Sequence, residues 1–153
     1  MYWINYKTGV EITDINQIDN SAIGFVYLIE FTDGTKYIGK KNLYSFVNVK
    51  PNKKDEAPKG TEIIYDYYKN TGKGFRQKMF HVKKESNWKT YNGSSKFTKD
   101  KTIKVKYILG YANTQLELTY LEAEHLFKYE VLKNDHFLNN TILGSFYKSN
   151  LLN

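Results

Sequence analysis

The chain has 153 residues, 41% of them apolar, which is enough for one compact core and predicts a single domain. It contains no cysteine, which excludes a disulfide scaffold, a zinc–thiolate site and a cysteine nucleophile. The formal net charge of +7 is typical of a protein with an anionic partner such as nucleic acid, although a lysine-rich composition alone gives the same balance.

The first 22 residues carry mixed signals, and an antiparallel hairpin is predicted over residues 24–39. Residues 24–31 (GFVYLIEF) are rich in aromatic and β-branched side chains, which favours a buried strand. Asp33-Gly34 is a hairpin turn signal, and residues 36–39 (KYIG) form the returning strand. No basic start precedes an apolar stretch, and no apolar run reaches the roughly 18 residues that span a bilayer, so we expect a cytoplasmic protein without membrane contact.

The middle of the chain is expected to be a basic insert at about 42–90. Residues 48–61 hold both prolines and several lysines and indicate an exposed loop. A helix is predicted to begin at Ile63 and to run through Tyr68, before the glycines around residues 71–74 break it. Residues 91–95 (YNGSS) form a turn that could open a short helix.

The last third of the chain predicts a strand and then a long helix. Residues 103–109 alternate in the manner of a strand. Thr114 and Glu117 form a capping box, so a helix is expected from there to about Lys133. Its core-facing stripe is predicted to contain Leu116, Tyr120, Ala123, Phe127 and Val131. The tail from residue 136 is expected to be irregular, and the whole arrangement is α+β.

Two tyrosines, Tyr27 and Tyr37, stand on opposite arms of the predicted hairpin. Pairing of the arms can bring both hydroxyls to one side of the sheet, and Gly39 leaves room for a close approach. The strings GFVY at 24–27 and YIGKK at 37–41 resemble the two segments that name the GIY-YIG nuclease family. This chain has one extra residue before the first tyrosine.

The segment at 85–95 (ESNWKTYNGSS) is similar to one found in small phage-encoded and restriction-type members, so the resemblance covers most of residues 24–140. It implies a single domain over 1–153, with a small antiparallel sheet flanked by helices, that hydrolyses phosphodiester bonds.

The resemblance also implies a metal-binding glutamate on a later helix and a supporting asparagine near the domain end. Glu122 is chosen over Glu124, because Leu118 and Leu126 place it on an apolar strip of the helix. An acidic residue on such a strip indicates a functional role. Asn139 fits the closing asparagine. Members of the family normally carry an arginine soon after the second motif, but residues 40–60 hold none. Either Arg76, the single arginine, acts as the phosphate clamp or a lysine replaces it.

The resemblance therefore predicts an endonuclease that cuts double-stranded DNA with one Mg²⁺ or Mn²⁺ ion held by Glu122. Tyr27 is expected to act as the general base and Tyr37 to position water or phosphate. The DNA contacts are expected from Lys36, Lys40, Lys41, Trp88, Ser94 and Ser95. A homodimer is left open. The alternatives are a catalytically inactive DNA-binding or nuclease-interfering protein on the same fold, and a plain RNA- or protein-binding α+β domain.

Overall fold

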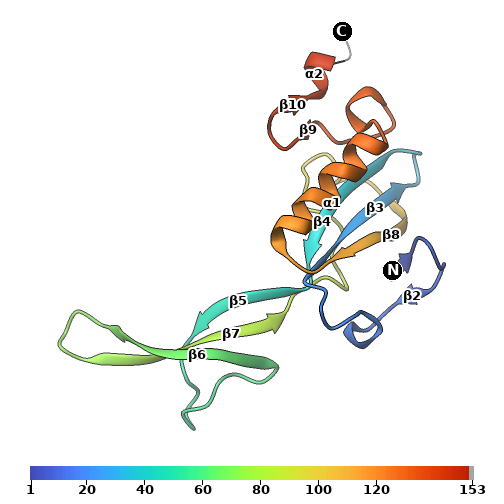
Figure 1. The fold of residues 1–153 in the computed structure, drawn as a ribbon. Coiled ribbons are helices and arrows are strands. Elements are labelled where there is room, and N and C mark those ends of the chain that lie inside the picture. Colours follow the sequence, from blue (N-terminus) through green and yellow to red (C-terminus); the bar gives the residue numbers. More distant parts are fainter. Residues whose placement is uncertain (152–153) are drawn as a thin grey trace. The chain divides into compact units, whose positions relative to one another are not determined.

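The computed structural model describes residues 1–151, which divide into two compact units (Figure 1). The first, here called the sheet-and-helix unit, contains residues 1–42 and the chain from residue 88 onward. The second, here called the insert unit, contains residues 43–87. No helix among the described residues is both long and apolar enough to cross a membrane.

The sheet-and-helix unit contains one five-stranded sheet and one main helix. Its elements in chain order are β1 (Trp3–Asn5), β2 (Glu11–Ile12), a 3-10 helix (Ile15–Gln17), β3 (Gly24–Phe31), β4 (Lys36–Asn42), β8 (Ile103–Ala112), α1 (Gln115–Lys128), a second 3-10 helix (Val131–Lys133), β9 (Thr141–Ile142), β10 (Phe146–Tyr147) and α2 (Lys148–Leu151). The α+β class is as predicted, but one main helix accompanies the sheet instead of flanking helices.

The strand order of the main sheet is β2-β1-β8-β3-β4. The predicted hairpin is confirmed, since β3 and β4 pair antiparallel with Tyr27 opposite Gly39 and Ile29 opposite Tyr37. The sheet is mixed, because β1 pairs parallel with β8. The first 22 residues therefore supply two short strands. The predicted antiparallel sheet is confirmed for β3, β4 and β8, whereas the parallel β1 makes the whole sheet mixed. Strands of two or three residues are too short to leave a periodic pattern in a sequence.

The two faces of the main sheet have different covers, as strand alternation requires. Val26, Leu28 and Ile38 face the core cluster that includes Leu118 and Leu126 of α1. The opposite face carries an aromatic cluster, in which Trp3, Phe25, Tyr27 and Trp88 are all at most 2% exposed. Both faces are therefore buried over the central strands.

Helix α1 begins as predicted, but it ends early and turns a different face to the sheet. The Thr114 hydroxyl accepts the Glu117 backbone N–H at 3.1 Å, while the Glu117 carboxylate accepts the N–H of Asn113, one residue before the expected partner. Glu130 adopts a left-handed conformation with φ of 50°, which ends the helical path before Lys133.

The predicted core stripe of this helix is wrong at three of its five positions, whereas Val131 is buried in the core cluster and Ala123 packs against it. Leu116, Tyr120 and Phe127 are 82%, 71% and 50% exposed, whereas Leu118 and Leu126 are buried. The buried stripe therefore runs through positions 118, 122 and 126, which includes Glu122. The pattern of large apolar residues misled because α1 is apolar on more than one side.

The insert unit is a three-stranded antiparallel sheet in the order β5-β7-β6. Its strands are β5 (Tyr44–Val49), β6 (Thr61–Asn70) and β7 (Arg76–Glu85). The helix predicted from Ile63 was wrong, because that segment pairs along its length with β7 and is rich in β-branched and aromatic residues. Residues 91–95 open no helix, and the tail contains short elements instead of being wholly irregular.

Candidate active site

Tyr27 and Tyr37 lie together on the aromatic face of the β3–β4 hairpin, as predicted. Their ring centroids are 6.4 Å apart. Tyr27 is 2% exposed, whereas Tyr37 is only partly buried. The two phenols thus differ in their access to solvent although they share one side of the sheet.

Gly39 is the residue that lets the Tyr27 side chain cross β4. A Cβ atom on Gly39 would lie 2.6 Å from Tyr27 Cζ and closer still to the hydroxyl oxygen. Real Cβ atoms do not approach other atoms this closely, so a larger residue would displace the phenol. The glycine of the second motif is therefore required by packing against the tyrosine of the first.

A third tyrosine, Tyr91, completes the cluster, and sequence reasoning assigned it no role. Its ring centroid lies 5.9 Å from that of Tyr27 in an edge-on arrangement. Lys41 Nζ lies 4.2 Å from the Tyr91 ring centroid, and the Tyr91 hydroxyl donates to Ser94 Oγ at 3.1 Å. The signal that could have found it was its place in the segment 85–95, which had already been compared with nuclease segments.

Lys106 anchors the loop that carries Tyr91. Its side chain is completely buried, and Nζ donates to the Tyr91 carbonyl at 2.8 Å and to Asn92 Oδ1 at 3.1 Å. Nζ also lies 4.4 Å from the centroid of the Trp3 ring. Burial lowers the pKa of Lys106 to about 8. Lys106 alternates with apolar neighbours along β8, and the aromatic cluster covers its face of the sheet.

Trp88 does not lie where a DNA contact is possible. It is 0% exposed, its ring packs edge-on against Phe25 at 6.3 Å, and its carbonyl accepts the Trp3 indole N–H at 2.6 Å. The expectation that Trp88 binds nucleic acid is therefore corrected: this tryptophan belongs to the core. Nothing in its local sequence distinguishes the two roles.

Glu122 lies on the stripe of α1 that faces the sheet, whereas Glu124 is exposed. Burial raises the pKa of Glu122, and the charge of Lys40 opposes that rise. The Glu122 carboxylate in turn contributes to the raised pKa values of Tyr37 and Tyr27. The acid on the helix and the two phenols on the hairpin therefore form one electrostatic group.

The pKa values of the two phenols are raised mainly by burial. For Tyr27 the neighbouring Tyr91 and Tyr37 raise the pKa further, which holds its hydroxyl protonated. For Tyr37 the charges of Glu122 and Tyr91 also raise the pKa, but a hydrogen bond with Ser95 lowers it. Tyr37 is therefore the more readily ionised of the two.

Lysines surround this group on β4. Lys40 Nζ donates to Thr119 Oγ1 of α1 at 2.8 Å, and Lys36 pairs with Glu30 at 3.6 Å. Arg76 belongs to the insert unit, where its guanidinium lies 5.9 Å from the centroid of the Tyr68 ring. The structure therefore brings Lys40 and Lys41 to the tyrosine hairpin, and the predicted role of Arg76 stays a prediction.

Asn139 pairs with the outer edge of β4, the last strand of the sheet. Its side-chain Oδ1 accepts the Ile38 N–H at 3.0 Å, and its Nδ2 donates to the Ile38 carbonyl at 2.7 Å. The preceding residues continue this pairing, because Lys36 N–H donates to His136 O and Leu138 N–H donates to Lys36 O, both at 2.8 Å. Asn139 thus fixes the backbone of Ile38, between Tyr37 and Gly39, and its role in the structure is to support this strand.

Glu122 would be the single protein ligand of a metal ion at this site. Among residues 1–151 no group of three or more His, Cys, Asp or Glu side chains could hold a metal. Mg²⁺ commonly keeps several waters and takes only one or two carboxylates, so a lone half-buried acid fits such an ion but not a fully caged one. Burial raises the pKa of Glu122, and a cation bound to the carboxylate would favour its charged form.

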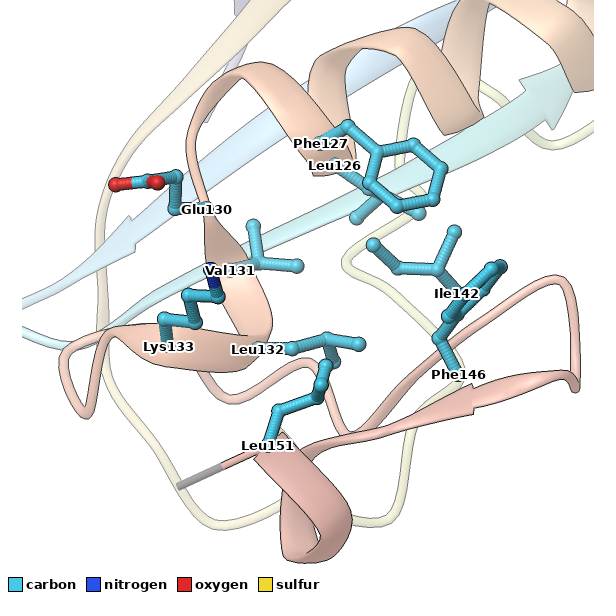
Figure 2. A pocket seen from close by; sticks show the side chains of 9 residues that line it. All are labelled: Leu126, Phe127, Glu130, Val131, Leu132, Lys133, Ile142, Phe146 and Leu151. Atoms are coloured by element: carbon cyan, nitrogen blue, oxygen red, sulfur yellow. The ribbon is translucent and has the colours of Figure 1, made fainter. Parts of the chain in front are cut away.

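Two pockets of the sheet-and-helix unit differ in character. A polar pocket of about 460 Å³ borders the tyrosine cluster through the 91–95 loop. Its lining includes Gly93, Ser94, Ser95, Lys96, Lys99 and Lys101. An apolar pocket of about 300 Å³ lies between the end of α1 and the C-terminal elements, as Figure 2 shows, and its lining includes none of the tyrosines.

The family comparison covers nearly all of these elements. The family model described as "Putative endonuclease segE, GIY-YIG domain" matches residues 3–142. The chain belongs to the GIY-YIG endonuclease family. The match extends from β1 to β9 and so includes both tyrosines of the hairpin, Glu122 and Asn139. No curated protein and no solved structure matches the chain.

Membership supports an endonuclease in general. The GIY-YIG segments of this chain, GFVY and YIG, are the two arms that meet at Tyr27 and Gly39. The match begins before the first motif, at Trp3 of β1, whose ring centroid lies 5.3 Å from that of Tyr27 in the aromatic cluster. The leader is therefore part of the family domain and supports the site.

Proposed function

We propose that this protein is a divalent-metal-dependent endonuclease that hydrolyses phosphodiester bonds in double-stranded DNA. The observation that carries the proposal is the meeting of Tyr27 and Tyr37 on one hairpin, with rings 6.4 Å apart, in a unit whose helix carries the half-buried Glu122. Phosphodiester hydrolysis needs a proton acceptor for water and a cation for the developing charge, and this group offers a place for each.

Tyr37 is the better candidate for the general base. A base must touch the attacking water, and Tyr37 is partly exposed whereas Tyr27 is 2% exposed. Tyr27, packed across Gly39, fixes the position of Tyr37, and its hydroxyl stays protonated and acts as a hydrogen-bond donor within the site. This assignment exchanges the roles expected from the sequence.

Glu122 would hold Mg²⁺ or Mn²⁺, which would supply positive charge to stabilise the phosphate and the leaving oxygen. Glu122 is one of the groups that raise the pKa of Tyr37, so a cation on its carboxylate would lessen that effect. Lys40, whose charge acts on Glu122, is proposed as the phosphate contact that stands in for the arginine expected after the second motif.

The polar pocket beside the tyrosines is proposed to hold the DNA backbone next to the scissile bond. Its lysines carry the charge that phosphates neutralise, and its serine hydroxyls and loop N–H groups are donors. Ser95 joins this pocket to the catalytic group through its hydrogen bond with Tyr37.

Supercoiled plasmid DNA incubated with the purified protein tests the proposal. We expect nicking or linearisation with Mg²⁺ or Mn²⁺ and none in chelator. Cutting that persists in chelator contradicts the metal scheme. Binding without cutting in every metal supports the second candidate, an inactive DNA-binding protein, which the missing arginine at residues 40–60 favours.

A further inference from the structure

The insert unit carries most of the net positive charge of the chain. Its 45 residues hold ten basic and five acidic side chains, which is +5 of the net +7. Nothing in the catalytic group described above uses this charge. A surface of this sign attracts a polyanion, and DNA is the polyanion that the proposed function supplies.

Part of this charge lies on a projecting two-stranded ribbon at the far end of the β6–β7 pair. Strand β5 pairs with β7 only from Phe80 to Glu85, whereas β6 and β7 stay paired as far as Asn70 opposite Arg76. Beyond β5 the pair is thus a two-stranded ribbon closed by a turn (Figure 1). Two-stranded β-ribbons are known to bind duplex DNA through the major or the minor groove.

The tip of this ribbon is wholly exposed and lacks acids. Every residue from Tyr68 to Arg76 is exposed, and the cations among them are Lys69, Lys73 and Arg76. By contrast, Lys78 just below the tip is paired with Asp55 at 3.3 Å. The three cations of the tip therefore have no acidic residue within residues 68–76.

The tip also presents a large apolar side chain. Phe75 is 74% exposed, and the turn that displays it is closed by Thr71, whose N–H and hydroxyl donate to the Phe75 carbonyl at 3.1 and 2.9 Å. Gly72 and Gly74 have φ of 78° and 77°, which the tight turn requires. An exposed phenylalanine held on a fixed basic turn is suited to insertion between bases.

We propose that the β6–β7 ribbon grips duplex DNA in the minor groove, with Lys69 and Lys73 on the phosphates and Phe75 as a wedge that unstacks one base step. Apolar wedges at the ends of basic elements act from this groove and kink the duplex. The inference rests on the proposed function for the identity of the partner, but it concerns binding and not cleavage.

The first test measures duplex binding by fluorescence anisotropy in chelator, where no cleavage interferes, over a range of salt. Lys69→Gln with Lys73→Gln should reduce the slope of log K against log salt by about 1.8, since each lost phosphate contact removes about 0.9. The matched control is Lys128→Gln with Lys133→Gln, two exposed lysines of the other unit, which should leave the slope unchanged. Equal changes in both double variants, or no duplex binding by the unaltered protein, overturn the proposal.

The second test places 2-aminopurine in the duplex. Its fluorescence should rise when the unaltered protein binds, and Phe75→Ala should abolish the rise without changing the melting temperature of the protein. Leu116→Ala, which removes an apolar side chain 82% exposed in the other unit, is the control and should behave as the unaltered protein. A rise that survives Phe75→Ala overturns the wedge.

The outcomes separate this inference from the proposed function. Plasmid cutting with unchanged binding by the ribbon variants rejects the ribbon and leaves the nuclease. Loss of binding in the ribbon variants of a protein that cuts nothing supports the ribbon and rejects the nuclease. Self-association that depends on concentration and disappears in Phe75→Ala assigns the tip to a second copy of the chain and overturns the proposal.

Discussion

The two units differ in the burial of the ionisable side chains that matter most for the proposed activities. In the sheet-and-helix unit Lys106 is fully buried and Glu122 is half-buried, and burial shifts the pKa of each. In the insert unit the cations at the ribbon tip are exposed, and no acid lies among residues 68–76. Burial gives a group a specific chemistry because it alters its ionisation, whereas exposure leaves it as a charge that attracts a partner from a distance.

This contrast explains why the two units should respond differently to mutation. Changes among buried groups should alter cleavage or stability and depend little on salt. Changes at the ribbon should alter binding and depend strongly on salt. The predictions below concern the buried group and run from the largest expected effect to the smallest.

Loss of the Tyr37 hydroxyl should have the largest effect. Tyr37→Phe should reduce the cleavage rate by about 10²- to 10⁴-fold, which is the contribution of a general base. Tyr27→Phe keeps the ring that packs across Gly39 and should cost less. Single-turnover cleavage rates for both variants decide between them, and a greater loss in Tyr27→Phe would restore Tyr27 as the base.

Gly39→Ala should disturb both folding and cleavage. The new methyl group would meet the Tyr27 phenol, so we expect a loss of about 1–3 kcal/mol in the free energy of unfolding, as in overpacked cores. Urea unfolding measures it. Gly34→Ala is the control for the loss of a glycine without a collision, since nothing lies within 4 Å of that position. The positive φ of 87° at Gly34 means that this control also introduces backbone strain. Because the new methyl group does not touch the Tyr27 phenol, cleavage should survive.

Asn139→Leu should destabilise the edge of β4. It leaves the Ile38 N–H and carbonyl without their side-chain partner, which costs about 2 kcal/mol in a buried position. Asn140→Leu, an exposed neighbour, is the control. An unchanged free energy of unfolding in Asn139→Leu would show that water replaces the amide.

Lys106 should give the smallest effect, visible as a dependence on pH. Its folded pKa of about 8 lies below the unfolded value near 10.4, so between these values the unfolded chain binds more protons. Stability should therefore rise with pH across that window by an amount on the order of 1 kcal/mol. The rise should be missing in Lys106→Met when urea unfolding is compared at pH 7.5 and 9.5. Parallel behaviour of the two proteins would contradict the lowered pKa.

The hairpin could be predicted from the sequence because its signals are local. Strand composition, an Asp-Gly turn and two spaced tyrosines all lie within 16 residues. The exact register, with Tyr27 opposite Gly39, was not predicted and is known only from the structure. The same holds for Glu122, because its neighbours four residues away, Leu118 and Leu126, proved to be the buried stripe of α1.

What could not be predicted depends on contacts between distant segments. Lys106 is buried because β1 and the Trp88 segment cover that face of β8, and neither contact leaves a signal near the lysine itself. Strand β6 became a strand because β7 was available to pair, although a helix suited its local pattern as well. Tyr91 reaches the site through the anchored loop, which is again a tertiary effect.

The most direct test of the account compares Glu122→Gln with Glu124→Gln in Mg²⁺-dependent cleavage of duplex DNA. Both changes remove one negative charge from α1, but Glu122 is half-buried and acts on the pKa of both tyrosines, whereas Glu124 is exposed. We predict that Glu122→Gln still binds DNA yet cleaves it at least about 100-fold more slowly, as expected when the single metal ligand is lost. Glu124→Gln should cleave at the rate of the unaltered protein. The opposite ranking, or equal rates in all three proteins, would contradict a catalytic centre built on Glu122 and the tyrosine hairpin.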